Sequence, residues 1–194
     1  GTLNLIGGTF TVGGNITSTN SAKSTAVVMI DGATLDMTNG SIDANTFDVR
    51  SGALKDVSEI YNGGGSVAAD LTKTTTGTLS LIGTNNYSGA TLINDGALEV
   101  RGTTGTGAVT AQTGSTILGS GVVQGATFTL DDAATLRPGD SVADSSHGTL
   151  TFTPATASAS TSSLQGTIVL GITGATVIDA TYGNNTLGTP GYDA

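Results

Sequence analysis

Residues 77–100 read Gly-Thr-Leu-Ser-Leu-Ile-Gly-Thr-Asn-Asn-Tyr-Ser-Gly-Ala-Thr-Leu-Ile-Asn-Asp-Gly-Ala-Leu-Glu-Val. This stretch contains the same pattern twice: a short run of apolar residues followed by a tight turn. Short alternating runs predict β-strands, and glycine or asparagine between them predicts turns. The pattern recurs with starts at Gly32, Gly52, Gly77, Gly96, Gly114 and Ala133. Most starts lie about twenty residues apart, a period typical of solenoids, in which each repeat buries its apolar face against the next.

These short strands, with no helical period between them, predict an all-β parallel β-helix (β-solenoid) in which three short faces make each coil. The chain is long enough for about nine to ten coils. We expect residues 1–194 to form a single β-helical segment of a longer protein, with a loop over the low-complexity stretch 154–166. One interior ladder is expected to contain Leu35, Leu54, Leu79, Leu98 and Leu118.

An antiparallel sandwich or barrel is the alternative architecture. Asp31-Gly32, Asn39-Gly40 and Asp95-Gly96 are dipeptides that commonly close two-residue hairpins, and they favour this alternative. Glycine also serves corners that need a positive φ, as a solenoid requires. The regular period therefore favours the parallel helix.

The composition argues against several classes of partner. Fifteen acidic and six basic residues give a formal charge of -9, which repels nucleic-acid phosphates and anionic lipid. We therefore expect no nucleic-acid partner. The chain has no cysteine, so disulfides and thiolate metal sites are absent. No apolar run approaches the length of about eighteen residues that spans a bilayer, so we expect no membrane insertion of this segment.

One segment of the chain contains three motifs in succession: Lys73-Thr74-Thr75-Thr76-Gly77-Thr78-Leu79-Ser80-Leu81, then Asn85-Asn86-Tyr87-Ser88-Gly89, then Asn94-Asp95-Gly96-Ala97-Leu98. This segment resembles the autotransporter-associated β-strand repeat, also called the passenger-associated transport repeat. The family pattern has a Lys-Thr-Gly lead, then Gly-Thr-Leu-x-Leu, Asn-x-Tyr-x-Gly and Gly-x-Leu. The segment departs from it at Thr75, where glycine is usual.

This resemblance implies a right-handed β-helix within the exported passenger of a large bacterial surface protein. In that family such repeats act as a stalk and support secretion. The resemblance implies no catalytic residue and no cofactor. We expect a secreted or cell-surface location, with the full-length protein attached to the outer membrane.

Few residues suggest chemistry. His147 is the only histidine, and Ser145 and Ser146 lie too close to it in sequence for a catalytic triad to form easily. Asp131, Asp132, Asp140 and Asp144 form an acidic cluster that suits calcium or a glycosidase carboxyl pair, although turn aspartates that cap backbone N–H groups explain it as well. We assign no catalytic, cofactor or metal site.

Two further patterns suit ligand binding. Thr-x-Thr pairs at Thr9 and Thr11, at Thr127 and Thr129, and at Thr149, Thr151 and Thr153 are similar to ice-binding arrays but are unevenly spaced. Four tyrosines offer sugar-stacking rings: Tyr61, Tyr87, Tyr182 and Tyr192. The basic residues that an acidic sugar would need are scattered: Lys23, Arg50, Lys55, Lys73, Arg101 and Arg137.

The sequence therefore predicts a non-catalytic structural or adhesive stalk segment. The alternative is a carbohydrate-binding or carbohydrate-active β-helix enzyme. A surface glycan and a host protein are the candidate partners. Because the free ends of a β-helix expose strand edges, end-to-end self-association is a further expectation.

Overall fold

The computed structural model describes residues 1–18, 25–139, 148–153 and 163–168. These ranges form short strands, most of them three to five residues long. The strands are β1 (Thr2–Ile6), β2 (Thr9–Thr11), β3 (Val27–Asp31), β4 (Ala33–Asp36), β5 (Ser41–Asp43), β6 (Thr46–Val49), β7 (Gly52–Lys55), β8 (Glu59–Tyr61), β9 (Leu71–Lys73), β10 (Thr78–Ile82), β11 (Thr91–Ile93), β12 (Ala97–Val100), β13 (Val109–Ala111), β14 (Thr116–Gly119), β15 (Val122–Val123), β16 (Phe128–Leu130), β17 (Thr135–Pro138), β18 (Thr151–Phe152), β19 (Ser163–Leu164) and β20 (Thr167–Ile168).

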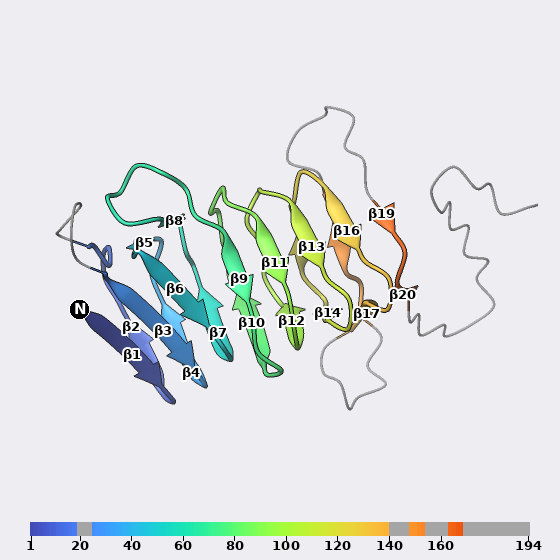
Figure 1. Cartoon of the computed structure of the whole chain (residues 1–194), viewed down its shortest axis with the longest axis horizontal. Helices are drawn as coiled ribbons and strands as arrows, with labels where there is room; N and C mark the ends of the chain where they lie inside the picture. The colour runs from blue at the N-terminus through green and yellow to red at the C-terminus, as the bar shows by residue number, and fades with distance from the viewer. Residues whose placement is uncertain (19–24, 140–147, 154–162, 169–194) are drawn as a thin grey trace, which may run out of the picture.

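Successive coils stack along one axis and build two long sheets (Figure 1). The first sheet has the order β1-β3-β6-β9-β11-β13-β16-β19, and the second has the order β2-β4-β7-β10-β12-β14-β17-β20. Neighbouring strands in both sheets are parallel, as between β10 and β12. The parallel β-helix is therefore confirmed, and the antiparallel alternative is wrong.

Eight strands in each long sheet correspond to eight coils in the described residues. The expectation of about nine to ten coils covered the whole chain, and residues 169–194 lie outside the described ranges. At about 4.8 Å between parallel strands, eight coils extend about 34 Å from the first strand to the last. β19 falls within residues 154–166, which were expected to form a loop, because Leu164 takes the register position beside Leu130.

The third face of the helix is less continuous than the two long sheets. β5 pairs with β8 and β15 pairs with β18, and each pair is a separate two-stranded ladder. Isolated parallel bridges join Ile16 to Ile42 and Thr103 to Val122. Over the described residues, backbone pairing on this face is therefore local, whereas each long sheet runs through all eight coils.

The dipeptides that suggested hairpins form corners of the coil. Asp31 ends β3 and Gly32 joins it to β4, Asn39-Gly40 lies between β4 and β5, and Asp95-Gly96 lies between β11 and β12. The φ of Gly96 is +69°, and a Cβ added there would lie 2.3 Å from the Thr75 carbonyl oxygen. Only glycine fits such a corner, because the left-handed conformation and the neighbouring coil both exclude a side chain.

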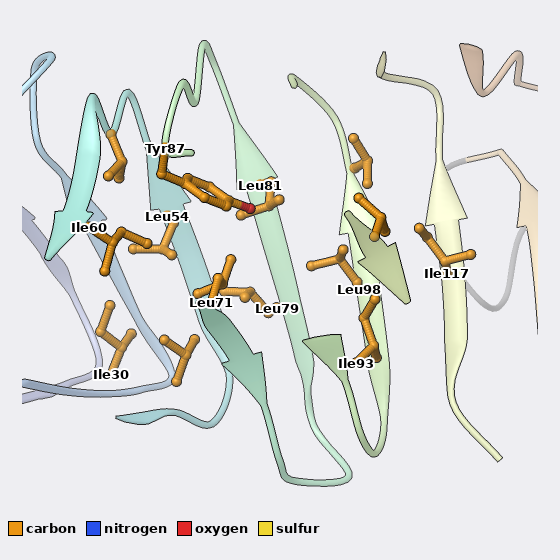
Figure 2. Packing of buried hydrophobic residues seen from close by; sticks show 14 of the residues in the cluster. Ile30, Leu54, Ile60, Leu71, Leu79, Leu81, Tyr87, Ile93, Leu98 and Ile117 are labelled. Carbon is orange, nitrogen blue, oxygen red and sulfur yellow. The ribbon is translucent and has the colours of Figure 1, made fainter. Parts of the chain in front are cut away.

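The interior consists of aliphatic side chains stacked in register from coil to coil. Leu79, Leu98 and Ile117 lie in one ladder, and each is fully buried (Figure 2). A second ladder contains Leu35, Leu54, Leu81 and Val100. Burying apolar side chains in this way is the main stabilising term of a solenoid, because each coil covers the next.

The single leucine ladder expected from the sequence is wrong at two positions. Leu54 is in register with Leu81, whereas Leu79 is in register with Gly52. Leu118 is in register with Glu99, so the inward position of β14 belongs to Ile117. An insertion causes the first error: Leu35 and Leu54 are 19 positions apart, but Leu54 and Leu81 are 27 apart.

The inserted residues form a small hairpin that follows β8. Tyr61 and Ala68 make an antiparallel bridge, and the Asn62 N–H donates to the Val67 carbonyl at 3.0 Å. The Gly64 N–H at its turn donates to the Asp43 carboxylate at 3.0 and 3.1 Å. The hairpin is thus anchored to the preceding coil without interrupting either long sheet.

Candidate functional site

The segment that resembles a family repeat, residues 73–98, directs several of its most distinctive side chains into the interior. Lys73, Leu79, Tyr87 and Leu98 are each at most 1% exposed, although they come from different faces of the coil. Figure 2 shows Tyr87 pointing into the same interior as Leu54 and Leu81. The residues that carry the resemblance therefore serve the stacking of coils.

Lys73 occupies an interior position between Val49 and Ile93 of the first sheet. Its ammonium donates to the Thr75 carbonyl, to Thr75 Oγ1 at 3.1 Å and to the Asp95 carbonyl at 3.4 Å. These acceptors belong to equivalent corners of two successive coils, so one side chain joins both corners. Burial lowers the pKa of Lys73 below its ordinary value.

Asn85 bridges three successive turns on the third face and is fully buried. Its carboxamide oxygen accepts the Val57 N–H at 3.2 Å, and its Nδ2 donates to the Thr103 carbonyl at 3.0 Å. Nδ2 also donates to the Ile82 carbonyl at 3.2 Å. Buried amides need such partners, so this side chain adds to the single backbone hydrogen bonds, such as Asn86 N–H to the Val57 carbonyl at 2.8 Å, where the third face has no ladder.

Tyr87 is fully buried, and its hydroxyl lies 2.8 Å from Thr91 Oγ1. Burial raises the pKa of Tyr87 to about 12 because an apolar interior disfavours the phenolate. The next coil lies directly against the ring: a Cβ at Gly105 would be 2.4 Å from the ring carbons. Tyr87 therefore requires glycine at position 105 and has no surface for stacking on a sugar.

Most of the basic residues are paired or buried. Lys55 lies 2.6 Å from Asp36 and 3.5 Å from Asp56, and Arg101 lies 3.0 Å from Glu99. The hydrogen bond with Lys55 lowers the pKa of Asp36, and the same bond raises the pKa of Lys55. Arg50 lies 2.9 Å from Asp48. These pairs connect neighbouring positions of the coils and do not gather the positive charge into one patch.

The structure tests the expected acidic cluster only in part. Asp131 and Asp132 lie in the turn between β16 and β17, and Asp140, Asp144, Ser145, Ser146 and His147 lie outside the described residues. The Asp131 carbonyl accepts the Ala134 N–H at 3.0 Å, which closes this turn. Within the described ranges, no three histidine or acidic side chains come close enough to hold a metal ion.

The Thr-x-Thr pairs do not share one face. Thr9 and Thr11 lie in β2 of the second sheet, Thr129 lies in β16 of the first sheet, and Thr151 lies in β18 of the third face. An ice-binding array needs its threonines on one flat surface, so these pairs do not form one. Of the four tyrosines, Tyr61 is half-buried at the base of the inserted hairpin, and Tyr182 and Tyr192 lie outside the described ranges.

A hollow of about 350 Å³ opens on the outer face of the second sheet, and we call it the second-sheet hollow. It crosses β10, β12, β14 and β17 and their preceding corners. Its lining residues are Thr76, Thr78, Asp95, Gly96, Ala97, Gly114, Thr116, Leu118 and Arg137. The sequence reasoning missed this site, and the 19-residue register, which places Thr78, Ala97 and Thr116 in one row, is the signal that identifies it.

Comparisons of the chain with protein-family models, with curated proteins and with solved structures found no match. The resemblance to the autotransporter repeat thus remains a prediction from the residues. In the part of the chain that the structure describes, no helix is long and apolar enough to cross a membrane.

Proposed function

We propose that this chain is a non-catalytic stalk segment of an exported bacterial surface protein, which spaces and displays other parts of that protein. The observation that carries the proposal is the use of residues 73–98. Their most distinctive side chains, Lys73, Asn85 and Tyr87, are buried and hydrogen-bonded within the stack. Side chains used in this way hold neighbouring coils together, as a stalk requires.

The architecture supports the same role. Two parallel sheets run through all eight described coils, and each coil buries its apolar side chains against its neighbours. Such a rod grows by adding coils and needs no change in its cross-section. The inserted hairpin at residues 62–68 leaves both sheets intact, so this stalk tolerates surface elements that project from it.

A carbohydrate-binding β-helix is the second candidate function, and the second-sheet hollow favours it. Adhesion to a surface glycan is compatible with a stalk, because a ligand on the outer face of a sheet would leave the apolar interior undisturbed. A host protein and end-to-end assembly with another copy stay proposals of the same kind. In each case we place the segment outside the cell or on its surface.

Grafting tests the stalk function. Residues 1–194 would be placed between the signal sequence and the membrane barrel of a bacterial autotransporter, and surface display would be measured by antibody labelling of intact cells. We expect display of the wild-type chain and reduced display of Leu98→Asp, which puts a charge into the interior stack.

The matched control is Leu92→Asp, because Leu92 lies on the same coil but at the outward, half-buried position of β11. We expect this variant to be displayed like the wild type. Wild-type chain that remains in the periplasm would contradict the proposal, as would equal display of Leu98→Asp and wild type.

A further inference from the structure

The second-sheet hollow is built into the backbone of the coils. Thr78, Ala97, Thr116 and Thr135 form one outward row across neighbouring strands, and alanine is the smallest of the four. The corner beside Ala97 is Gly96, where no side chain fits because a Cβ would lie 2.3 Å from the Thr75 carbonyl oxygen. Gly96 and Ala97 therefore contribute almost no side-chain volume to this part of the surface.

The lining of the hollow combines aliphatic and polar groups. Ala97 and Leu118 are buried in its floor, and the hydroxyls of Thr78 and Thr116 belong to the two strands on either side of Ala97. Asp95 is exposed at one corner, and one of its carboxylate oxygens accepts the Gly96 N–H at 2.7 Å. Arg137 lines the hollow from β17, where it is in register with Leu118.

This set of groups favours a neutral, polyhydroxylated ligand. A carboxylate accepts hydrogen bonds from hydroxyls, a guanidinium donates to them, and threonine does both. Asp95 disfavours an anionic ligand and Arg137 disfavours a cationic one. A small hollow with an aliphatic floor and a few polar groups suits the C–H face and the hydroxyl edge of one sugar ring.

The row of hydroxyls continues beyond the hollow. Thr116 is in register with Thr135, and Thr135 with Thr167, so threonines follow one another at the strand spacing of about 4.8 Å. A chain of sugar rings that leaves the hollow along the axis of the rod would meet a hydroxyl on each of these coils. The geometry thus favours a polymer over a single sugar.

We propose that the second-sheet hollow binds one ring of a neutral polysaccharide, and that the polysaccharide extends along Thr116, Thr135 and Thr167. The proposal rests on the proposed function and specifies the glycan-binding role of the stalk. It concerns a ligand on the outer surface and not the apolar interior, so a rod that binds no glycan would leave the stalk function intact.

Isothermal titration calorimetry tests the proposal with maltohexaose, cellohexaose, laminarihexaose and xylohexaose, with glucose and xylose as single rings, and with hexagalacturonate as an acidic probe. We expect at least one neutral hexasaccharide to bind more tightly than its monosaccharide. Ala97→Ile should fill the hollow with a side chain that suits a strand, and should weaken binding by about tenfold or more, equivalent to about 1.4 kcal/mol.

A second variant, Asp95→Asn, keeps an acceptor for the Gly96 N–H and should also weaken binding. Thr110→Ile makes a comparable change at an outward position of the first sheet and should leave binding unchanged. Three results would overturn the proposal: no neutral hexasaccharide binds the wild type, only hexagalacturonate binds, or Ala97→Ile binds as tightly as the wild type while its circular dichroism shows a folded chain. Surface display of the grafted chain is measured separately, so failure of this site and failure of the stalk function are distinguishable.

Discussion

Truncating Leu98 to alanine tests whether the coils depend on stacked leucines. Leu98 is fully buried between Leu79 of the preceding coil and Ile117 of the following coil. Leucine-to-alanine changes in cores cost about 2–5 kcal/mol, with the larger values where the surroundings cannot collapse into the cavity. Parallel hydrogen bonds fix the neighbouring strands about 4.8 Å apart, so we expect a loss of about 3–5 kcal/mol in the free energy of unfolding.

Urea unfolding followed by circular dichroism measures this loss. Leu92→Ala is the control, because Leu92 has the same side chain on the adjacent strand of the same coil but is half-buried and points outward. We expect the control to cost about 1 kcal/mol or less. Hydrogen exchange should locate the damage: protection should fall in β10, β12 and β14 and persist in β3, since each coil contacts only its neighbours.

Similar losses for Leu98→Ala and Leu92→Ala would refute the reasoning, because inward and outward leucines would then contribute equally. A loss below about 1 kcal/mol at Leu98 would also refute it, since a fully buried leucine in a rigid stack cannot be removed at so small a cost.

Three other substitutions test the buried polar residues. In Lys73→Met, the free energy of unfolding should rise less between pH 7 and pH 10 than in the wild type. Burial lowers the pKa of Lys73 in the folded chain, so as the pH rises the folded lysine loses its proton while the unfolded one, with its ordinary pKa of 10.5, still holds it. The free energy of unfolding would be measured by urea titration at several pH values. An equal rise with pH in Lys73→Met and in the wild type would contradict this reasoning. Tyr87→Phe leaves the buried Thr91 hydroxyl without its partner and should cost about 1–3 kcal/mol by thermal unfolding, and no change in melting temperature would count against it. Gly105→Ala should destabilise the chain because the added carbon would lie 2.4 Å from the Tyr87 ring and 2.3 Å from the Tyr87 carbonyl oxygen. A Tyr87→Leu background removes the ring and keeps the carbonyl, so the penalty should shrink without disappearing; equal penalties in both backgrounds would exclude the ring as a cause.

The period of the sequence was sufficient to predict the parallel stack, because a β-helix repeats its apolar pattern once per coil. It was not sufficient to predict the register. Leu79 was placed above Leu54, but the inserted hairpin shifts the alignment so that Leu81 takes that position. A shift of two residues keeps the same side chains inward, so the apolar pattern alone does not detect it.

The buried polar residues were also beyond prediction from composition. Alternation from Leu71 places Lys73 on the inward face of β9, but lysine is rarely buried, so its residue type argued against an interior position. Its burial depends on carbonyl groups of two corners, which are adjacent only after the coils have stacked. The second-sheet hollow depends in the same way on the alignment of Thr78, Ala97 and Thr116 across three coils.

Because backbone pairing on the third face is interrupted, the stiffness of the rod depends on the direction in which it is bent. The two long sheets resist stretching along the axis through unbroken ladders of hydrogen bonds. Over the described residues, the third face has two short ladders, isolated bridges, single backbone hydrogen bonds, and side chains such as Asn85 that join neighbouring coils. A lateral load that places the third face under tension therefore meets less resistance from backbone pairing than a load that stretches either long sheet. A rod built from such coils would therefore bend more easily with the third face on its convex side than with either long sheet there.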